Sequence, residues 1–213
     1  MEIEVGGVLF DNDGVLVDSH RQVESAWGQL AAEFDLDIQT LLGELAGVRA
    51  VDTLSRYLTP DQAARADARL EDLELELAHT TRPLKGAPDV LNHLDDLSWS
   101  IVTSASRRLA EARWRGAGIT VPPSTVTADD VSHGKPYPDP YLLAARSLGV
   151  DPTDCVVFED SASGGSAGRA AGSTVIAVGA QPWTFEPWAR VNDLTGVQVR
   201  LLETGRTLIR IRT

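Results

Sequence analysis

Two carboxylates stand two residues apart at the end of a short apolar run near the N-terminus. Val8-Leu9-Phe10 is followed directly by Asp11-Asn12-Asp13-Gly14. Carboxylates this close repel each other, so the site has to contain something that offsets their charge. A carboxylate can act as a nucleophile on phosphorus, and a second one can move protons. We therefore expect Asp11 to attack phosphorus and Asp13 to serve as general acid and base.

Three further groups of polar residues follow predicted strands or precede predicted helices. They are Thr103-Ser104-Ala105-Ser106, Gly134-Lys135-Pro136 and Glu159-Asp160. Taken alone, each has an ordinary structural explanation: a helix cap, a solvated lysine, or acidic residues near a helix N-terminus. Ligands in open α/β sheets bind beyond the carboxyl ends of the strands. Four such groups in succession at one edge therefore predict a single binding site.

The residue types in these four groups suit phosphoryl transfer assisted by Mg²⁺. This ion takes hard oxygen ligands, which Asp11, Glu159 and Asp160 can supply. Its charge would offset that of the clustered carboxylates. The oxygens of a phosphate group can be bound by positive charge and by donors near a helix N-terminus, here Lys135, the Ser104 hydroxyl and the Ala105 amide.

Short apolar strands alternate with helical segments over most of the chain, which is typical of an α/β fold. Strands are expected at residues 5–11, 98–104, 155–158 and 173–178, and a hairpin at 198–212. Residues 20–81 show only helical spacing. We predict a Rossmann-like, doubly wound, mainly parallel sheet formed by residues 1–18 and 84–213, with a helical cap inserted at 19–83. Trp183, Phe185 and Trp188 are expected to pack a late helix.

Composition limits the compartment and the partners. The net charge of −12 argues against nucleic-acid binding, which needs a basic face. No run approaches the roughly 18 apolar residues of a membrane span, and the acidic start at Glu2 and Glu4 does not resemble a signal peptide. Cys155 is the only cysteine and lies in an apolar run, so we expect a buried thiol and no disulfide. We expect a cytoplasmic protein, monomeric or weakly dimeric, that binds a small molecule and neither nucleic acid nor membrane.

Taken in order, four motifs resemble those of the haloacid-dehalogenase-like superfamily of phosphohydrolases. They are Asp11-x-Asp13-Gly14-Val-x-x-Asp18-Ser19, Ile101-Val102-Thr103-Ser104, Gly134-Lys135-Pro136-x-Pro138-Asp139 and Phe158-Glu159-Asp160. Within the superfamily, the chain is similar to the helical-cap subgroup of β-phosphoglucomutase-like sugar and polyol phosphatases. Phosphatases of glycerol 3-phosphate and of 2-deoxyglucose 6-phosphate are examples of this subgroup.

The resemblance implies a Mg²⁺-dependent phosphatase that hydrolyses small phosphorylated sugars or polyols through an aspartyl-phosphate intermediate. It implies that Ser104 and Lys135 bind the phosphate, and that the cap closes over the site and selects the substrate. It also implies that the metal is bound by a set of oxygen ligands: the carboxylates of Asp11, Glu159 and Asp160 and the backbone carbonyl of Asp13.

Four other activities compete with this one. A haloacid dehalogenase lacks an acid at the position of Asp13, so the presence of Asp13 argues against that activity. A phosphonate hydrolase needs a lysine in the cap, and residues 19–82 contain no lysine. A sugar phosphomutase of the β-phosphoglucomutase type shares all four motifs, and Arg49 is a candidate cap residue for its second anion. A non-catalytic regulator that binds a phosphorylated ligand would be expected to have lost one of these motif residues. The mutase and the regulator stay as alternatives.

Overall fold

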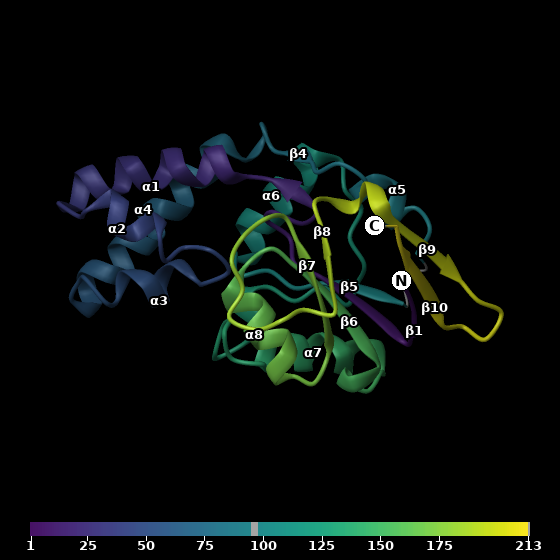
Figure 1. The fold of residues 1–213 in the computed structure, drawn as a ribbon. Coiled ribbons are helices and arrows are strands. Elements are labelled where there is room, and N and C mark those ends of the chain that lie inside the picture. The colour runs from purple at the N-terminus through teal and green to yellow at the C-terminus, as the bar shows by residue number, and fades with distance from the viewer. Residues whose placement is uncertain (95–97, 213) are drawn as a thin grey trace.

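The structure is a computed structural model, and it describes residues 1–94 and 98–212. Its centre is a five-stranded parallel sheet in the order β5-β2-β6-β7-β8 (Figure 1). The strands are β2 (Gly7–Phe10), β5 (Trp99–Ile101), β6 (Cys155–Glu159), β7 (Thr174–Val178) and β8 (Ala189–Val191). The predicted α/β fold with a doubly wound parallel sheet is confirmed.

Helices cover both faces of this sheet, and its central strands accordingly consist mainly of apolar residues. Val8 and Phe10 of β2 contribute to a cluster with α5 (Ala87–Leu91) and α6 (Arg107–Ala117). Leu9 points to the opposite cluster, which includes α7 (Asp139–Leu148) and α8 (Ala162–Ala170). The alternation follows from the two-residue period of a strand. In the described residues, short 3₁₀ helices lie in the connections: η1 (Ala128–Asp130), η2 (Pro152–Asp154) and η3 (Leu194–Gly196).

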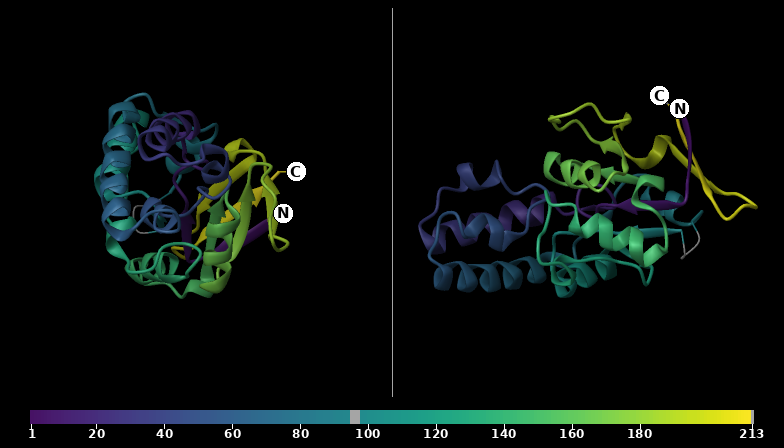
Figure 2. Two further views of the ribbon diagram at one scale, coloured as in Figure 1. Left: turned by 90° about the vertical axis from the view of Figure 1, so that its left-hand side faces the viewer. Right: turned by 90° about the horizontal axis from the view of Figure 1, so that it is seen from below.

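Four helices form a block that extends from one end of the sheet layer, opposite the end where the termini lie (Figure 2). We call them the helical block: α1 (His20–Phe34), α2 (Ile38–Leu42), α3 (Ala50–Leu54) and α4 (Pro60–Ala78). The block has its own apolar cluster, including Trp27, Leu30 and Leu70. Two short antiparallel strands, β3 (Val17–Asp18) and β4 (Arg82–Pro83), connect it to the rest of the chain.

The strand predicted at residues 5–11 is divided in two. Gly6 separates β2 from β1 (Glu2–Val5), and its amide donates to the Asp154 carbonyl at 2.9 Å. β1 leaves the parallel sheet and pairs with β10 (Thr207–Ile211), which pairs in turn with β9 (Val197–Leu201). The predicted C-terminal hairpin is thereby confirmed, as part of a separate three-stranded antiparallel sheet.

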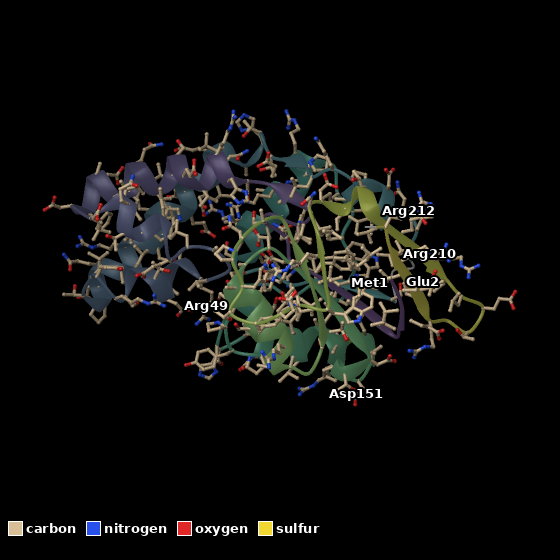
Figure 3. All side chains as sticks on the ribbon, in the orientation of Figure 1. Met1, Glu2, Arg49, Asp151, Arg210 and Arg212 are labelled. Atoms are coloured by element: carbon tan, nitrogen blue, oxygen red, sulfur yellow. The ribbon has the colours of Figure 1, made fainter. Side chains whose placement is uncertain are left out.

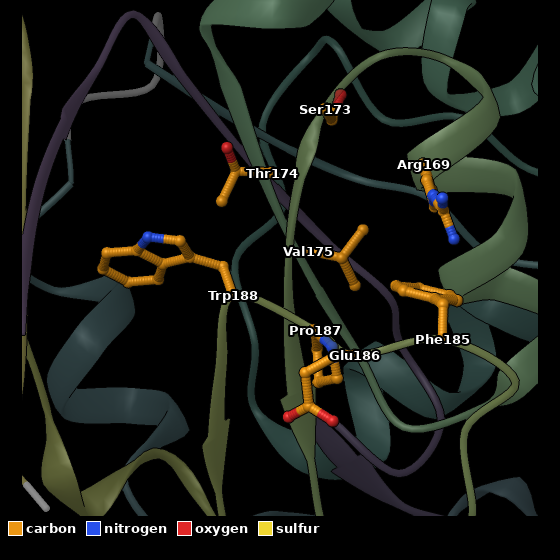
Figure 4. A pocket seen from close by; sticks show the side chains of 8 residues that line it. All are labelled: Arg169, Ser173, Thr174, Val175, Phe185, Glu186, Pro187 and Trp188. Atoms are coloured by element: carbon orange, nitrogen blue, oxygen red, sulfur yellow. The ribbon is translucent and has the colours of Figure 1, made fainter.

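The prediction that Trp183, Phe185 and Trp188 pack a late helix is wrong. Pro182 and Pro187 remove backbone donors there, and the segment runs as an irregular loop into β8. Trp188 packs against the cluster on one face of the sheet, whereas Trp183 and Phe185 pack against the cluster on the other. Beside β7 the loop borders a hollow of about 500 Å³ that also includes Arg169, whose guanidinium carbon lies 5.1 Å from the centre of the Phe185 ring (Figure 4).

The expected burial of the Cys155 thiol is confirmed. Cys155 is free and buried, and burial raises the pKa of its thiol to about 12. The thiol is therefore protonated at neutral pH and packs as an apolar group. A search of the helices in the described part of the chain finds none with the length and hydropathy to cross a bilayer.

Gly28 offers a direct test of the helical block. It lies within α1, and a methyl group added there would meet no atom within 4 Å. Because alanine loses less backbone entropy in a helix than glycine, Gly28→Ala should raise the free energy of unfolding by about 0.5–1 kcal/mol. Denaturant unfolding followed by circular dichroism measures the change.

The matched control is Gly86→Ala. Gly86 has a φ of 83°, and an added Cβ would lie 2.3 Å from the carbonyl carbon of Leu194. This variant should lose stability by more than about 1 kcal/mol. A gain in stability at Gly86, or a loss at Gly28, would contradict the described backbone.

Candidate active site

Neighbouring parallel strands bring three carboxylates together. β2 and β6 are aligned with Phe10 opposite Phe158, so Asp11 follows one strand where Glu159 ends the other. The Asp11 amide donates to the Phe158 carbonyl at 2.9 Å, which continues the sheet pairing to this point. One carboxylate oxygen from each of Asp11, Glu159 and Asp160 lies within 4.8 Å of the others. Three of the four residues predicted to bind a metal, all except Asp13, thus form one cluster that can hold a cation.

Lys135 inserts its ammonium group into this cluster. Its Nζ donates to Asp11 Oδ1 at 2.5 Å, to Glu159 Oε1 at 2.6 Å and to the Val102 carbonyl at 3.0 Å. The side chain is 1% exposed. Burial lowers the pKa of Lys135, but Asp11 and Glu159 outweigh that effect and raise it above its usual value. Lys135 is therefore a permanent cation that bridges two strand ends.

Glu159 and Asp160 have different surroundings although they are adjacent in sequence. Glu159 Oε1 accepts from Lys135 and, at 2.9 Å, from the Tyr141 hydroxyl. Glu159 Oε2 accepts from the Ser161 amide at 3.0 Å and from the Ser161 hydroxyl at 2.9 Å. Within the described part of the chain, Asp160 accepts no hydrogen bond. Glu159 is thus held by four protein donors, whereas the oxygens of Asp160 are available to a ligand.

The cluster carries more negative charge than the protein compensates. Three carboxylates face one ammonium group. Burial, followed by the charge of Glu159, raises the pKa of Asp11 to about 8. Burial, followed by the charges of Asp11 and Glu159, raises the pKa of Asp160 to about 9. Hard oxygen donors with uncompensated charge fit a bound divalent cation.

Asp13 lies in the turn after β2 and is held by donors from three segments. Its Oδ1 accepts from the Ser19 hydroxyl at 2.5 Å and pairs with Arg113 Nη1 at 3.1 Å. Its Oδ2 accepts from Asn12 Nδ2 at 3.1 Å. The Asn12 side chain is fixed in turn, because its Oδ1 accepts from Trp114 Nε1 at 2.8 Å. The turn and helix α6 therefore share one hydrogen-bonded network.

A cavity of about 890 Å³ lies between the carboxylate cluster and the helical block. Asp11, Asp13 and Asp160 line its side toward the sheet, and residues of α1, α3 and α4 line the opposite side. The two sides also touch directly, because the Ser104 hydroxyl donates to the Gly47 carbonyl at 3.0 Å. The helical block is thus docked against the sheet layer over the cluster.

The predicted phosphate-binding donors after β5 are the Ser104 hydroxyl and the Ala105 amide, and both residues line this cavity. Each of these donors makes a hydrogen bond to another residue of the protein. Ser104 bonds to Gly47, and the Ala105 amide donates to Thr103 Oγ1 at 3.1 Å. Ser106 caps α6 by accepting from the Leu109 amide at 3.2 Å. Ser106 therefore has the ordinary role of a helix cap, whereas Ser104 and Ala105 line the cavity with their donors bonded to Gly47 and Thr103.

Arg49 lies where the helical block meets the rest of the molecule (Figure 3). Its Nε donates to Asp52 Oδ2 at 2.7 Å and its Nη2 to Asp52 Oδ1 at 3.0 Å. Its Nη1 donates to the Val131 carbonyl at 3.3 Å. Arg49 therefore lines the cavity with its charge already paired to Asp52.

Sequence reasoning did not find the residues that support the cluster. Tyr141 and Ser161 carry no pattern that separates them from an ordinary helix residue and helix cap. Arg113 had a detectable pattern, because it shares the buried face of α6 with Leu109 and Trp114. An arginine among apolar helix positions indicates a buried ion pair.

The model of the haloacid dehalogenase-like hydrolase family matches residues 5–172. The chain belongs to this family. The match includes the turn with Asp11 and Asp13, the Lys135 loop and the end of β6, which are the segments that form the carboxylate cluster.

Two of the relatives are named as a phosphatase and a phosphohydrolase. The chain is 42% identical to hexitol phosphatase A of Escherichia coli over 82% of this chain and 83% of the relative. It is 29% identical to glycerol-1-phosphate phosphohydrolase 2 of Saccharomyces cerevisiae, over 84% and 76%. A solved hydrolase from Pseudomonas syringae superimposes with a TM-score of 0.79 at 25% identity, covering 89% of this chain and 94% of that one.

The raised pKa values predict how stability depends on pH when metal is removed. In the unfolded chain Asp11 and Asp160 ionise near 3.8, but in the folded protein near 8 and 9. Between these values the folded state binds protons that the unfolded chain has released, so stability falls as pH rises. In EDTA, Tm should be lower at about pH 8.5 than at about pH 5.5, and Mg²⁺ should reduce the difference. Equal Tm values in EDTA at both pH values would show that the cluster is not short of positive charge.

Proposed function

We propose that the protein is a Mg²⁺-dependent phosphatase that hydrolyses small phosphorylated sugars or polyols through an aspartyl-phosphate. The observation that carries this proposal is the placement of Asp11, Asp13 and Asp160 on one side of the cavity, with the Lys135 ammonium group bonded to Asp11. The relatives named as hexitol and glycerol phosphate phosphatases support the class of substrate.

Asp11 and Asp13 perform the two chemical steps. A carboxylate oxygen of Asp11 attacks phosphorus, and the bond to the leaving oxygen breaks while Asp13 gives that oxygen a proton. Water then attacks the phosphorus of the aspartyl-phosphate, Asp13 takes its proton, and inorganic phosphate leaves. The Lys135 ammonium group donates a hydrogen bond to Asp11 Oδ1. The other carboxylate oxygen of Asp11 thereby points away from this ammonium group.

Asp11, Asp160 and the backbone carbonyl of Asp13 are the proposed direct ligands of Mg²⁺. When bound, the ion neutralises the phosphate charge and the repulsion among the carboxylates. Glu159 belongs to the same cluster, but its two oxygens already accept four protein hydrogen bonds. We therefore assign Glu159 mainly to holding Lys135, and Asp160 to the metal.

Residues 19–83 are proposed as a cap on a catalytic core of residues 1–18 and 84–213. The separate apolar cluster of α1 to α4 and the paired β3 and β4 support this division. A cap that docks over the cavity keeps water away from the aspartyl-phosphate until the alcohol has left, and its side chains contact the part of the substrate beyond the phosphate.

Phosphatase chemistry is favoured over a phosphomutase by the charges in the cavity. A mutase has to bind a second phosphate at the far end of its intermediate, which needs an available cation. The two arginines that line the cavity are both paired: Arg49 with Asp52, and Arg113 with Asp13 and Glu74. This arrangement supports a substrate with one phosphate and an uncharged remainder.

The class of reaction is tested by turnover with and without Mg²⁺. The protein should release phosphate from hexitol, hexose and glycerol phosphates in Mg²⁺ and not in EDTA, and kcat/KM should rank the substrates. No phosphate release from any monoester would reject the proposal in favour of a phospho-ligand-binding regulator. Conversion of a hexose 1-phosphate to its 6-phosphate without net phosphate release would support the mutase.

Asp11→Asn removes the nucleophile while preserving the size of the side chain. Activity should fall by at least about 10³-fold, and no phosphoenzyme should form. Rapid acid quench with ³²P-labelled substrate measures the phosphoenzyme, and circular dichroism checks the fold. Substantial acid-stable labelling in Asp11→Asn would place the nucleophile at another residue.

Asp160→Asn and Glu159→Gln separate the two adjacent acids. Asp160→Asn should raise the Mg²⁺ concentration for half-maximal activity by about 10-fold or more. Glu159→Gln should mainly lower kcat, because it weakens the hold on Lys135. Titration of activity with Mg²⁺ gives both quantities, and a larger shift of the Mg²⁺ requirement in Glu159→Gln would reverse the assignment.

A further inference from the structure

A buried arginine joins the helical block to Asp13. Arg113 lies on α6 and is 4% exposed. Its Nη1 pairs with Asp13 Oδ1 at 3.1 Å, and its Nη2 donates to Glu74 Oε1 at 3.0 Å. Glu74 belongs to α4 and is itself buried. The three charges thus form a continuous chain from the helical block to the proposed acid and base.

Other polar contacts between α4 and the start of α6 do not include Asp13. Arg108 pairs with Glu71 at 3.1 Å and with Asp72 at 3.5 Å, but its side chain is 64% exposed. The Ser106 hydroxyl also donates to Glu71. These contacts hold the two helices together, whereas Arg113 in addition touches Asp13. The interface therefore contains two arginines that can be compared, one in contact with Asp13 and one not.

Burial makes the position of Arg113 depend on both carboxylates. A buried ion that loses one partner is left with uncompensated charge, which is costly enough to move the side chain toward water or another partner. If α4 separates from α6, Glu74 leaves and Arg113 is free to turn away from its present position. The direction of the Asp13 carboxyl group then changes, because Arg113 is one of the donors that hold Asp13 Oδ1.

We propose that Arg113 and Glu74 are positioning residues that orient Asp13 for proton transfer when the helical block is docked. The proposal rests on the proposed phosphatase function. Proton transfer needs the carboxyl group within about 2.6–3.2 Å of the reacting oxygen, so a displaced Asp13 is a poor acid and a poor base. Docking of α4 thereby completes the proton-transfer group as well as covering the cavity.

The chemistry of the leaving group distinguishes positioning from general damage. An alkoxide from a hexitol phosphate is a strong base and needs the proton from Asp13, whereas p-nitrophenolate leaves without one. The parameter kcat/KM reports the steps up to formation of the aspartyl-phosphate. Misplacing Asp13 should therefore lower kcat/KM for the hexitol phosphate and leave that for p-nitrophenyl phosphate nearly unchanged.

Arg113→Met should reduce kcat/KM for glucitol 6-phosphate by about 10²-fold and that for p-nitrophenyl phosphate by less than about 3-fold. Glu74→Gln should lower the ratio of kcat/KM for glucitol 6-phosphate to kcat/KM for p-nitrophenyl phosphate by about 10-fold. Arg113→Lys keeps the charge and should recover part of the loss. With p-nitrophenyl phosphate, Arg113→Met should also show a burst of p-nitrophenolate, because hydrolysis of the aspartyl-phosphate still needs Asp13 as base.

Arg108→Gln is the control, because it removes an ion pair from the same interface without touching Asp13; its ratio should match that of the wild type. If Arg113→Met does not fold, Glu74→Gln and the double variant Glu74→Met/Arg113→Met provide the same measurement without an unpaired buried cation. Equal losses on both substrates, or a wild-type ratio in folded Arg113 and Glu74 variants, would overturn the proposal. Failure of the wild type to hydrolyse either substrate would instead reject the phosphatase function itself.

Discussion

The position of the Lys135 ammonium group between Asp11 and Glu159 is the constraint on which the site depends. The three charged groups are almost completely buried, so each requires the others to remain where they are. Asp11 and Glu159 follow neighbouring strands, and Lys135 comes from the loop before α7. The bridge therefore ties that loop to two strand ends and sets the position of Asp11, the proposed nucleophile, relative to the sheet.

One consequence of this bridge is that adjacent acids acquire different properties. Glu159 faces Lys135, Tyr141 and Ser161, which satisfy both of its oxygens, while Asp160 points to the cavity. The same chemical group is thus structural at one position and free to bind a ligand at the next. The sheet reverses side-chain direction at each residue, so a pair of acids at a strand end is divided in this way by geometry alone.

Much of the site was predictable because strand ends are predictable. Asp11 and Glu159-Asp160 follow short apolar runs, and parallel strands place such residues at one edge. The partners that come from helices were not, since Arg113 of α6 and Tyr141 of α7 reach the site through helix docking that the local sequence does not encode. The departure of β1 from the sheet likewise depends on a distant partner, β10. The irregular late segment differs from these cases, because Pro182 and Pro187 already argued against a helix.

The short pairing of β3 with β4 places both ends of the helical block side by side. Val17 lies opposite Pro83, and Asp18 lies opposite Arg82. The chain therefore leaves the sheet layer and returns to it through one pair of adjacent strands, and no strand of the parallel sheet passes through the block. A segment attached in this manner can be lengthened, shortened or exchanged over evolution without altering the register of the sheet, so the walls of the cavity can change while the cluster around Asp11 stays the same.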